Sequence, residues 1–232
     1  MTKVKYCGLR NERDIQLAIQ LGIDYIGFVV VPESKRFVTV DQIVVFQRLL
    51  ERLETTVEPV LVMMDLSAED TIELATKTKV SHLQLAGNES ADFCRQLKED
   101  HSYTIWKSWH VSVDDDGSGS EEEANELCSY LQVVDGILLD TSYQGKKGGT
   151  GTTFHWEVIN RYQQMMGDVP MIVAGGLTPD NVKALIDRYR PFAVDVSSGI
   201  ESDGIKDQVK MKDFALSVRE ANHESGQFGT FR

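Results

Sequence analysis

Eight short apolar segments recur along the chain, and a longer segment with the spacing of an amphipathic helix follows each of them. The apolar segments span Val4–Cys7, Tyr25–Val29, Pro59–Met64, His82–Leu85, Thr104–Trp109, Gly136–Leu139, Met171–Ala174 and Ala193–Val196. The amphipathic segments span 12–21, 40–53, 68–78, 89–99, 121–131, 156–166, 179–188 and 206–220. Strands that alternate with helices in this way pair in parallel, because each helix returns the chain to the same end of the sheet.

This alternation predicts an α/β protein with a single (β/α)8 TIM-barrel domain over residues 1–232, ending in a mobile polar tail at 223–232. Eight parallel strands are the number that closes such a barrel, although a doubly wound open sheet remains the alternative from the pattern alone. The acidic segment 114–123 falls between the fifth strand and its helix. We interpret it as a solvated loop that leads into a helix N-terminus, where carboxylates favour the dipole.

The composition argues against several kinds of partner. The net charge of −12 disfavours nucleic acids and anionic membrane surfaces, which select basic proteins. No segment has the roughly 20 apolar residues of a membrane span, and no signal-peptide core precedes the first strand, so we expect a cytoplasmic protein. Cys7, Cys94 and Cys128 are widely spaced and predict neither disulfides nor a zinc site. The five histidines fall on different elements, which disfavours a metal site.

Two polar residues stand at the carboxyl ends of predicted strands, where the active site of such a barrel forms. Cys7 ends the first strand, and Asp140 follows the sixth. A carboxylate directly after an apolar strand would be partly desolvated, which raises its pKa and suits it to the role of general acid. The alternatives are that Cys7 is a small buried hydrophobic residue and that Asp140 caps a turn.

Glycine-rich turns follow the last three strands. After the seventh strand we expect Thr178 to cap a helix that begins at Pro179. Backbone N–H groups at such turns and helix N-termini bind phosphate. The predicted phosphate-binding residues are Gly149, Gly175, Gly176, Ser198 and Gly199. The segment 145–151, with two lysines among its glycines, is a candidate for a mobile lid over an anionic ligand.

The same segments carry a resemblance to the phosphoribosylanthranilate isomerases. The similar segments are Lys5–Leu9, Gly27–Val29, Ser34–Val38, Leu138–Thr141, Gly148–Gly151, Ala174–Pro179, Val194–Glu201 and Gly204–Asp207. The resemblance implies an Amadori rearrangement of N-(5-phosphoribosyl)anthranilate to 1-(2-carboxyphenylamino)-1-deoxyribulose 5-phosphate in tryptophan biosynthesis. It implies a small phosphosugar as the partner and no cofactor or metal, because the substrate nitrogen is the electron sink. We expect a monomer or a weak homodimer.

By this resemblance Cys7 is the general base and Asp140 the general acid. A neutral Asp140 would protonate the ribose ring oxygen, and a Cys7 thiolate would then remove the C2′ hydrogen of the iminium. Thiolate formation calls for a lowered Cys7 pKa, for which the sequence supplies no cause. Arg36 is expected to face the anthranilate carboxylate with its bidentate fork, and Gln84 and Asp195 are expected to contact the substrate.

Three places depart from the family pattern. Ala86 stands where the family has His, Met64–Asp65 where the third strand usually ends in Asn, and Thr152 and His155 where it has Lys and Asp. These departures affect the expected lining of the anthranilate side. Two other functions remain open: an isomerase or epimerase of another phosphosugar, and a non-catalytic phosphosugar sensor. Another phosphosugar isomerase would have no need of Arg36 beside an aromatic acid. A non-catalytic sensor would need neither the Cys7 thiol nor the carboxyl group of Asp140.

Overall fold

The computed structural model describes residues 1–99, 101–115, 117–143, 146–147 and 154–227. Eight of the strands in these ranges are parallel: β1 (Lys3–Cys7), β2 (Tyr25–Val29), β3 (Glu58–Met63), β4 (His82–Leu85), β5 (Thr104–Ser112), β6 (Gly136–Tyr143), β8 (Met171–Val173) and β9 (Ala193–Val196). They are hydrogen-bonded in the order β5-β4-β3-β2-β1-β9-β8-β6, and a further β5–β6 pairing closes the ring. The prediction of a (β/α)8 barrel is confirmed, and the open-sheet alternative is wrong.

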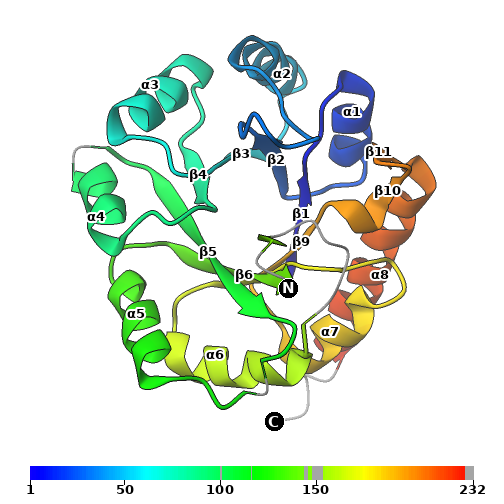
Figure 1. Ribbon diagram of the computed structural model, residues 1–232. Coiled ribbons are helices and arrows are strands. Elements are labelled where there is room, and N and C mark those ends of the chain that lie inside the picture. Colours follow the sequence, from blue (N-terminus) through cyan, green and yellow to red (C-terminus); the bar gives the residue numbers. More distant parts are fainter. Residues whose placement is uncertain (100, 116, 144–145, 148–153, 228–232) are drawn as a thin grey trace.

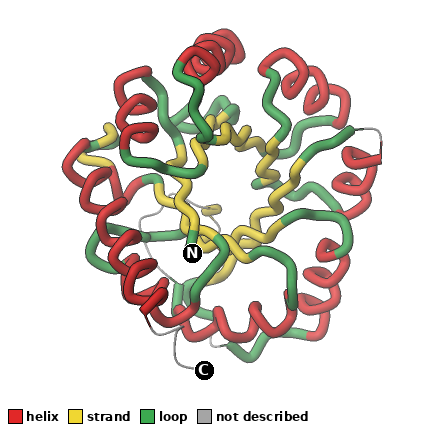
Figure 2. The backbone as a smooth tube through the Cα atoms, turned by 180° about the vertical axis from the view of Figure 1, so that it is seen from behind, coloured by secondary structure: helices red, strands yellow, loops and turns green. Residues whose placement is uncertain are grey.

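The described residues form eight α-helices. Figures 1 and 2 show that they surround the ring of strands. They are α1 (Glu12–Gln20), α2 (Val40–Arg52), α3 (Ala68–Thr78), α4 (Ala91–Glu99), α5 (Glu121–Leu131), α6 (Ile159–Met166), α7 (Val182–Tyr189) and α8 (Gln208–Gln227). The smaller elements are β7 (Lys146–Lys147), β10 (Glu201–Ser202), β11 (Ile205–Lys206) and the 3-10 turns η1 (Trp156–Val158) and η2 (Ser198–Ile200).

Side-chain caps define where several helices begin. Asn11, Ser67 and Ser120 each accept a hydrogen bond from a backbone N–H in the first turn of α1, α3 and α5. Thr39 and Gln42 form a reciprocal capping box at the start of α2. Each contact satisfies a helix N–H that has no partner within the helix, so the short polar residues between strand and helix determine the boundary locally.

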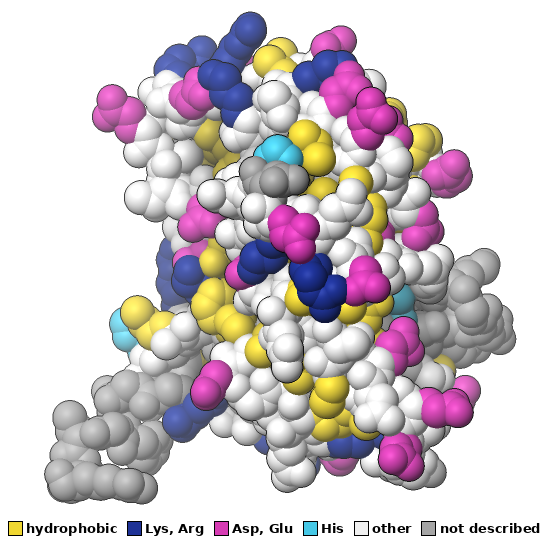
Figure 3. All heavy atoms as spheres, turned by 90° about the vertical axis from the view of Figure 1, so that its left-hand side faces the viewer, with side chains coloured by type: hydrophobic (Ala, Val, Ile, Leu, Met, Phe, Trp, Pro, Cys, Tyr) yellow, Lys and Arg dark blue, Asp and Glu magenta, His cyan; other side chains and the backbone are white. Residues whose placement is uncertain are grey.

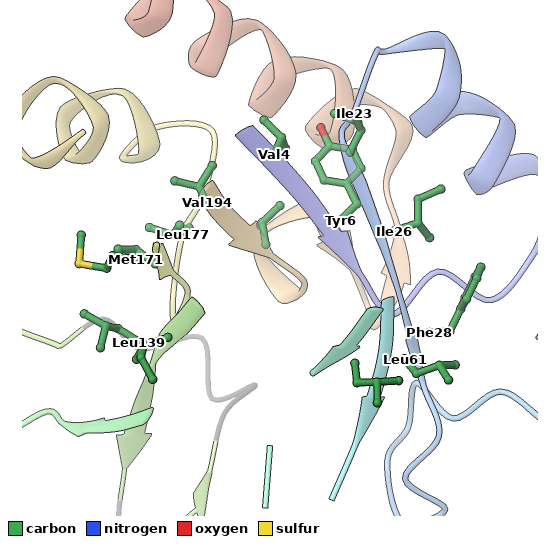
Figure 4. Close-up of a cluster of buried hydrophobic side chains, with 14 of the residues drawn as sticks. Val4, Tyr6, Ile23, Ile26, Phe28, Leu61, Leu139, Met171, Leu177 and Val194 are labelled. Carbon is green, nitrogen blue, oxygen red and sulfur yellow. The ribbon is translucent and has the colours of Figure 1, made fainter. Parts of the chain in front are cut away.

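Alternation along the strands divides the core into an outer and an inner layer. Odd and even residues of a strand face opposite sides of the sheet. On β1, Tyr6 faces the helices, where its hydroxyl donates to the Met211 carbonyl of α8. Figure 4 shows Tyr6, Ile26 and Phe28 in this outer cluster. Lys5 and Cys7 face the barrel interior instead. Near the amino ends of the strands the interior is filled by Trp106, which packs against Tyr25 with ring centroids 4.9 Å apart.

Two strands run further than the sequence predicts. β5 and β6 pair from Trp106–Gly136 to Ser112–Ser142, beyond their expected ends at Trp109 and Leu139. The apolar runs from which the two strands were predicted end before this extension, so the prediction stopped short of it. Asp140 therefore lies within β6 rather than after it, opposite His110.

The starts of two helices also differ from prediction. α7 begins at Val182 rather than Pro179, and Asn181 takes the N-cap position in place of Thr178. The Asn181 carboxamide accepts from the Thr178 N–H at 2.8 Å, which makes residues 178–181 a turn of their own. The expectation for Thr178 was wrong because both residues are good caps, and a side-chain contact across the turn decides between them. α4 begins at Ala91, two residues after its expected start.

The acidic segment 114–123 is only partly solvated. Asp115 and Glu123 both accept from Arg161 of α6, at 2.9 and 3.1 Å, and the Asp115 side chain is 13% exposed. The expectation of a fully solvated loop was wrong because the partner, Arg161, lies 38 to 46 residues away in sequence. At the other end of the chain, α8 continues to Gln227 through the first part of the predicted tail. Residues 228–232 lie outside the described ranges.

The described surface carries mixed charge. On the face in Figure 3, acidic and basic side chains are interspersed. None of the described helices combines the length and the apolar character that a membrane span requires.

Candidate active site

A cavity of about 340 Å³ opens at the carboxyl ends of the barrel strands. Its walls include Cys7 from β1, Arg36 from the loop after β2, Gln84 from β4, Asp140 from β6 and Asp195 from β9. Three further predicted residues line it: Gly175, Gly176 and Ser198. Five strands or loops that are distant in sequence thus deliver predicted side chains to one cavity, because all carboxyl ends of parallel strands meet at one rim of the barrel.

Two predicted phosphate ligands are not in this wall. Gly199 lines a neighbouring cavity that shares Gly176 and Ser198 with the first. Gly149 lies outside the described residues, as does the rest of the candidate lid 145–151 except Lys146 and Lys147, which form β7.

Cys7 occupies a tight place between β1 and β2. A Cβ atom on Gly27 would lie 2.9 Å from Cys7 Sγ, so the glycine leaves the room that the thiol needs. The residue is 8% exposed and lines the cavity. Burial raises the pKa of Cys7 above its usual value, although the ammonium groups of Lys5 and Lys206 oppose this effect. The lowered pKa that the sequence argument called for is therefore not a property of this site.

Asp140 has the raised pKa that its sequence position predicted. Burial and the nearby charge of Asp195 raise the pKa of Asp140 to about 6. The Thr141 N–H, which donates to Asp140 Oδ1 at 2.8 Å, lowers the pKa but does not outweigh these two effects. Roughly a tenth of the molecules therefore carry the Asp140 proton at pH 7. His110, opposite Asp140 on β5, also lines the cavity and was missed. The only signal for it was the apolar–polar alternation of residues 109–112, which could have extended the strand.

Arg36 is held by a carboxylate of the protein itself. Its Nε and Nη2 donate to the two carboxylate oxygens of Glu201 at 2.7 and 2.8 Å, and both side chains are buried. Lys206 donates to the same carboxylate at 2.8 Å. Burial alone would raise the pKa of Glu201, but Arg36 and Lys206 outweigh it and hold the pKa at about 2. The Nη1–Nη2 edge of the guanidinium is the fork that Glu201 does not occupy, and it can take a second carboxylate end-on.

A buried polar network lies beneath the cavity. The Lys5 ammonium donates to Gln84 Oε1 at 2.8 Å and to Asp195 Oδ1 at 3.0 Å, and Gln84 Nε2 donates to Ser108 Oγ at 3.1 Å. Lys5 is completely buried. Gln84 and Asp195 are thus tied to Lys5 as well as exposed to the cavity. Neither Lys5 nor Glu201 was assigned a role from the sequence, because their partners lie in other strands and loops.

The glycine turns after β8 and β9 touch each other. A Cβ atom on Gly199 would lie 1.7 Å from the Leu177 carbonyl oxygen, so the two turns approach more closely than any side chain permits. Gly175 and Gly176 have φ values of +82° and +64°, in the left-handed region that favours glycine. Such turns direct backbone N–H groups outward, and N–H groups of this kind bind anions.

Replacement of Gly199 by Ala is expected to destabilise the protein by about 2 kcal/mol or more, because the new methyl group overlaps a backbone carbonyl that cannot move freely. Thermal unfolding measures the loss. The matched control is Gly22→Ala, where φ is +63° at the end of α1 and the nearest neighbour of a new Cβ atom would lie at an ordinary 3.6 Å, so only backbone strain of about 1 kcal/mol is expected. Equal losses of melting temperature in the two variants would contradict the close approach of the turns.

Comparison with known proteins agrees with this geometry. Residues 4–216 match the family model described as N-(5′-phosphoribosyl)anthranilate (PRA) isomerase. The chain is 36% identical to an N-(5′-phosphoribosyl)anthranilate isomerase of Thermoanaerobacter sp. (strain X514), over 94% of this chain and 98% of the relative. It is 32% identical to that of Bacillus subtilis (strain 168), over 90% and 91%.

Solved structures give the same result. The chain superposes on the phosphoribosyl anthranilate isomerase of Thermotoga maritima with a TM-score of 0.80 and 32% identity, covering 95% of this chain and all of the other. A phosphoribosyl anthranilate isomerase in complex with reduced 1-(o-carboxyphenylamino)-1-deoxyribulose 5-phosphate gives a TM-score of 0.77 and 30% identity, at the same coverage. The chain belongs to the N-(5′-phosphoribosyl)anthranilate isomerase family.

Proposed function

We propose that this chain catalyses the Amadori rearrangement of N-(5′-phosphoribosyl)anthranilate to 1-(2-carboxyphenylamino)-1-deoxyribulose 5-phosphate, a step of tryptophan biosynthesis. Family membership supports the reaction. One observation carries the assignment of residues: Cys7 and Asp140 line the same cavity at the catalytic rim of the barrel. Cys7 is the general base and Asp140 the general acid.

The chemistry follows from these two groups. Protonated Asp140 gives its proton to the ribose ring oxygen, and the C1′–O bond breaks to form an iminium. The Cys7 thiolate then removes the acidified C2′ hydrogen, and the resulting enolamine ketonises. No net proton is consumed, because Cys7 takes up as many as Asp140 releases. The substrate nitrogen accepts the electron pair, so the reaction requires neither a metal nor a redox cofactor.

The cavity wall suggests how the substrate lies. The Nη1–Nη2 edge of Arg36 suits the anthranilate carboxylate, and apolar side chains suit the aromatic ring. Those apolar side chains are Val29, Val31, Val62 and Ala86. The turns at 175–176 and 198–199 offer backbone N–H groups to the phosphate at the opposite side. Gln84 and Asp195 then face the ribose between these ends.

We also propose that the chain is a cytoplasmic monomer or weak homodimer. A Thermotoga maritima relative is described as dimeric. Obligate dimers bury broad apolar faces, whereas the large hydrophobic side chains that are exposed among the described residues lie on several separate elements: Met1, Phe37, Val45, Leu53, Ile205, Val209 and Leu216. Size-exclusion chromatography with light scattering would measure the molar mass across a hundredfold range of protein concentration. A dimer mass at every concentration would contradict the proposal.

The activity test uses substrate made in place. Anthranilate and phosphoribosyl pyrophosphate are combined with the upstream transferase, and the fluorescence of phosphoribosylanthranilate is followed. The protein is purified from a host that lacks its own isomerase. Faster loss of fluorescence than in the enzyme-free reaction is expected. Decay at the uncatalysed rate would overturn the proposed function.

Replacement of Arg36 by Lys is expected to raise KM by about tenfold or more and to change kcat less, because lysine keeps the charge but loses the planar fork. Steady-state kinetics with the same substrate measure both constants. Arg10→Lys is the matched control, since Arg10 is exposed and, within the described ranges, donates to the backbone carbonyls of Lys35 and Gly204. An unchanged KM in the Arg36 variant would remove this residue from the carboxylate site.

A further inference from the structure

Lys5 is an ammonium group in a place where a barrel core could hold an apolar residue. It is completely buried on β1, two residues before Cys7, so both side chains point into the barrel. A Cβ atom on Gly27 would lie 2.9 Å from Cys7 Sγ and 3.2 Å from Lys5 Cε, so both side chains pack against the backbone of this β2 glycine. A buried ion pair is rarely more stabilising than well-packed apolar residues. Stability alone therefore does not account for Lys5.

The partners of Lys5 orient it. Asp195 is its Cα partner across the β1–β9 pairing and accepts from its ammonium at 3.0 Å, while Gln84 accepts at 2.8 Å. An ammonium group has three donors. Two are used by these oxygens, and the charge of the same ammonium acts on Cys7, whose side chain lies two residues along the same face of β1.

The order of strands places Asp195 between the two proposed catalytic groups. Cys7 is on β1 and Asp140 on β6, and the ring runs β1-β9-β8-β6. The ammonium end of the Lys5–Asp195 pair thus adjoins the base, while its carboxylate end lies on the side of the acid.

We propose that Lys5 and Asp195 form a polarised ion pair that sets the charge of both catalytic groups: the ammonium supports a negative sulfur on Cys7, and the carboxylate keeps the proton on Asp140. The inference rests on the proposed function for the roles of Cys7 and Asp140. Lys5 is a positioning residue, because it acts through Cys7 and does not contact the substrate.

The electrostatics of the two sites agree with this arrangement. Lys5 lowers the pKa of Cys7 more than Asp195 raises it. At Asp140 the order is reversed, and Asp195 raises the pKa more than Lys5 lowers it. One ion pair therefore acts with opposite sign on an acid and a base that need opposite protonation states.

The other charged groups around Cys7 are largely paired with each other. Arg36 and Lys206 both reach Cys7 electrostatically, and Arg36 also acts on Asp140. Both cations bind the carboxylate of Glu201, however, at 2.7 and 2.8 Å. Lys5 heads the charged groups that lower the pKa of Cys7, and its own counter-ion is part of the proposed pair.

The test titrates the Cys7 thiol without any substrate. Iodoacetamide reacts with the thiolate, so the rate of Cys7 alkylation against pH gives the titration midpoint, and peptide mass spectrometry distinguishes Cys7 from the other two cysteines. Lys5→Met is expected to move the midpoint up by about one unit or more, and Asp195→Asn to move it down. Lys5→Arg is expected to stay near the wild type. The matched control Lys3→Met, four residues from Cys7 at the other end of β1, is expected to leave the midpoint unchanged.

The result is decisive in either direction. Midpoints that stay in place, or that move in the same direction in Lys5→Met and Asp195→Asn, would overturn the proposal. If Lys5→Met does not fold, Asp195→Asn decides alone, since its amide oxygen still accepts from Lys5. Alkylation needs no turnover, so a failed isomerase assay would overturn the proposed function and leave this titration informative. Where activity is present, the acid limb of the pH–rate profile should move down in Asp195→Asn and up in Lys5→Met.

Discussion

Replacement of Asp140 by Asn is expected to lower kcat by at least about 10²-fold, because the ribose ring oxygen loses its positioned proton donor. The Asn side chain keeps an oxygen that can accept from the Thr141 N–H, so the fold should be preserved. The fluorescence assay measures the rate, and thermal unfolding checks the fold. Asp114→Asn, an exposed change near the same rim after β5, is the control and should leave kcat unaltered.

The pH dependence of this variant is a sharper test than its rate. In the proposed mechanism the reactive form has protonated Asp140 and ionised Cys7, yet the pKa of Asp140 is about 6 and that of Cys7 is raised above its usual value. Between these two values, each unit of pH removes about nine-tenths of the acid form and adds tenfold more thiolate. The wild-type rate should therefore be flat between them, fall below about pH 6 as the thiolate disappears, and fall at high pH as protonated Asp140 disappears.

Without the acid, only the thiolate fraction remains to vary. The residual rate of Asp140→Asn should climb about tenfold per pH unit through the range in which the wild type is flat. A variant that keeps the wild-type plateau would show that the alkaline limb does not belong to Asp140, and the assignment of this residue as general acid would fall.

Replacement of Cys7 by Ala is expected to cost at least about 10²-fold in kcat as well, because the thiolate proposed to remove the C2′ hydrogen is lost. The remaining rate should fall about tenfold per pH unit above pH 6, where Asp140 loses its proton. Cys7→Ser should lie near the Ala variant, since a hydroxyl is far less ionised than a thiol. Cys128→Ala, on the exposed side of a helix, is the matched control. A fully active Cys7→Ala enzyme would end the mechanism but not the fold.

Local patterns were sufficient for the architecture and for placing Cys7 and Asp140 at the same cavity. Strand and helix periods, cap residues such as Thr39 and Ser120, and glycine turns are expressed within a few residues of sequence. A polar residue at the end of an apolar run, as at Cys7 and Asp140, identifies the rim of a barrel once the fold class is known. His110 was missed because the short alternation of residues 109–112 is a weak local signal, and its pairing with Asp140 on β6 is not local.

The sequence by itself determined that eight strand–helix units fold into a barrel, and which polar residues reach its catalytic rim, because both depend on short-range periodicity. Only the tertiary structure decided the charge environment of those residues. Arg36 meets Glu201 across 165 residues, and Lys5 meets Asp195 across 190. Coulombic and desolvation energies depend on distance in space and on burial, neither of which is encoded by spacing along the chain.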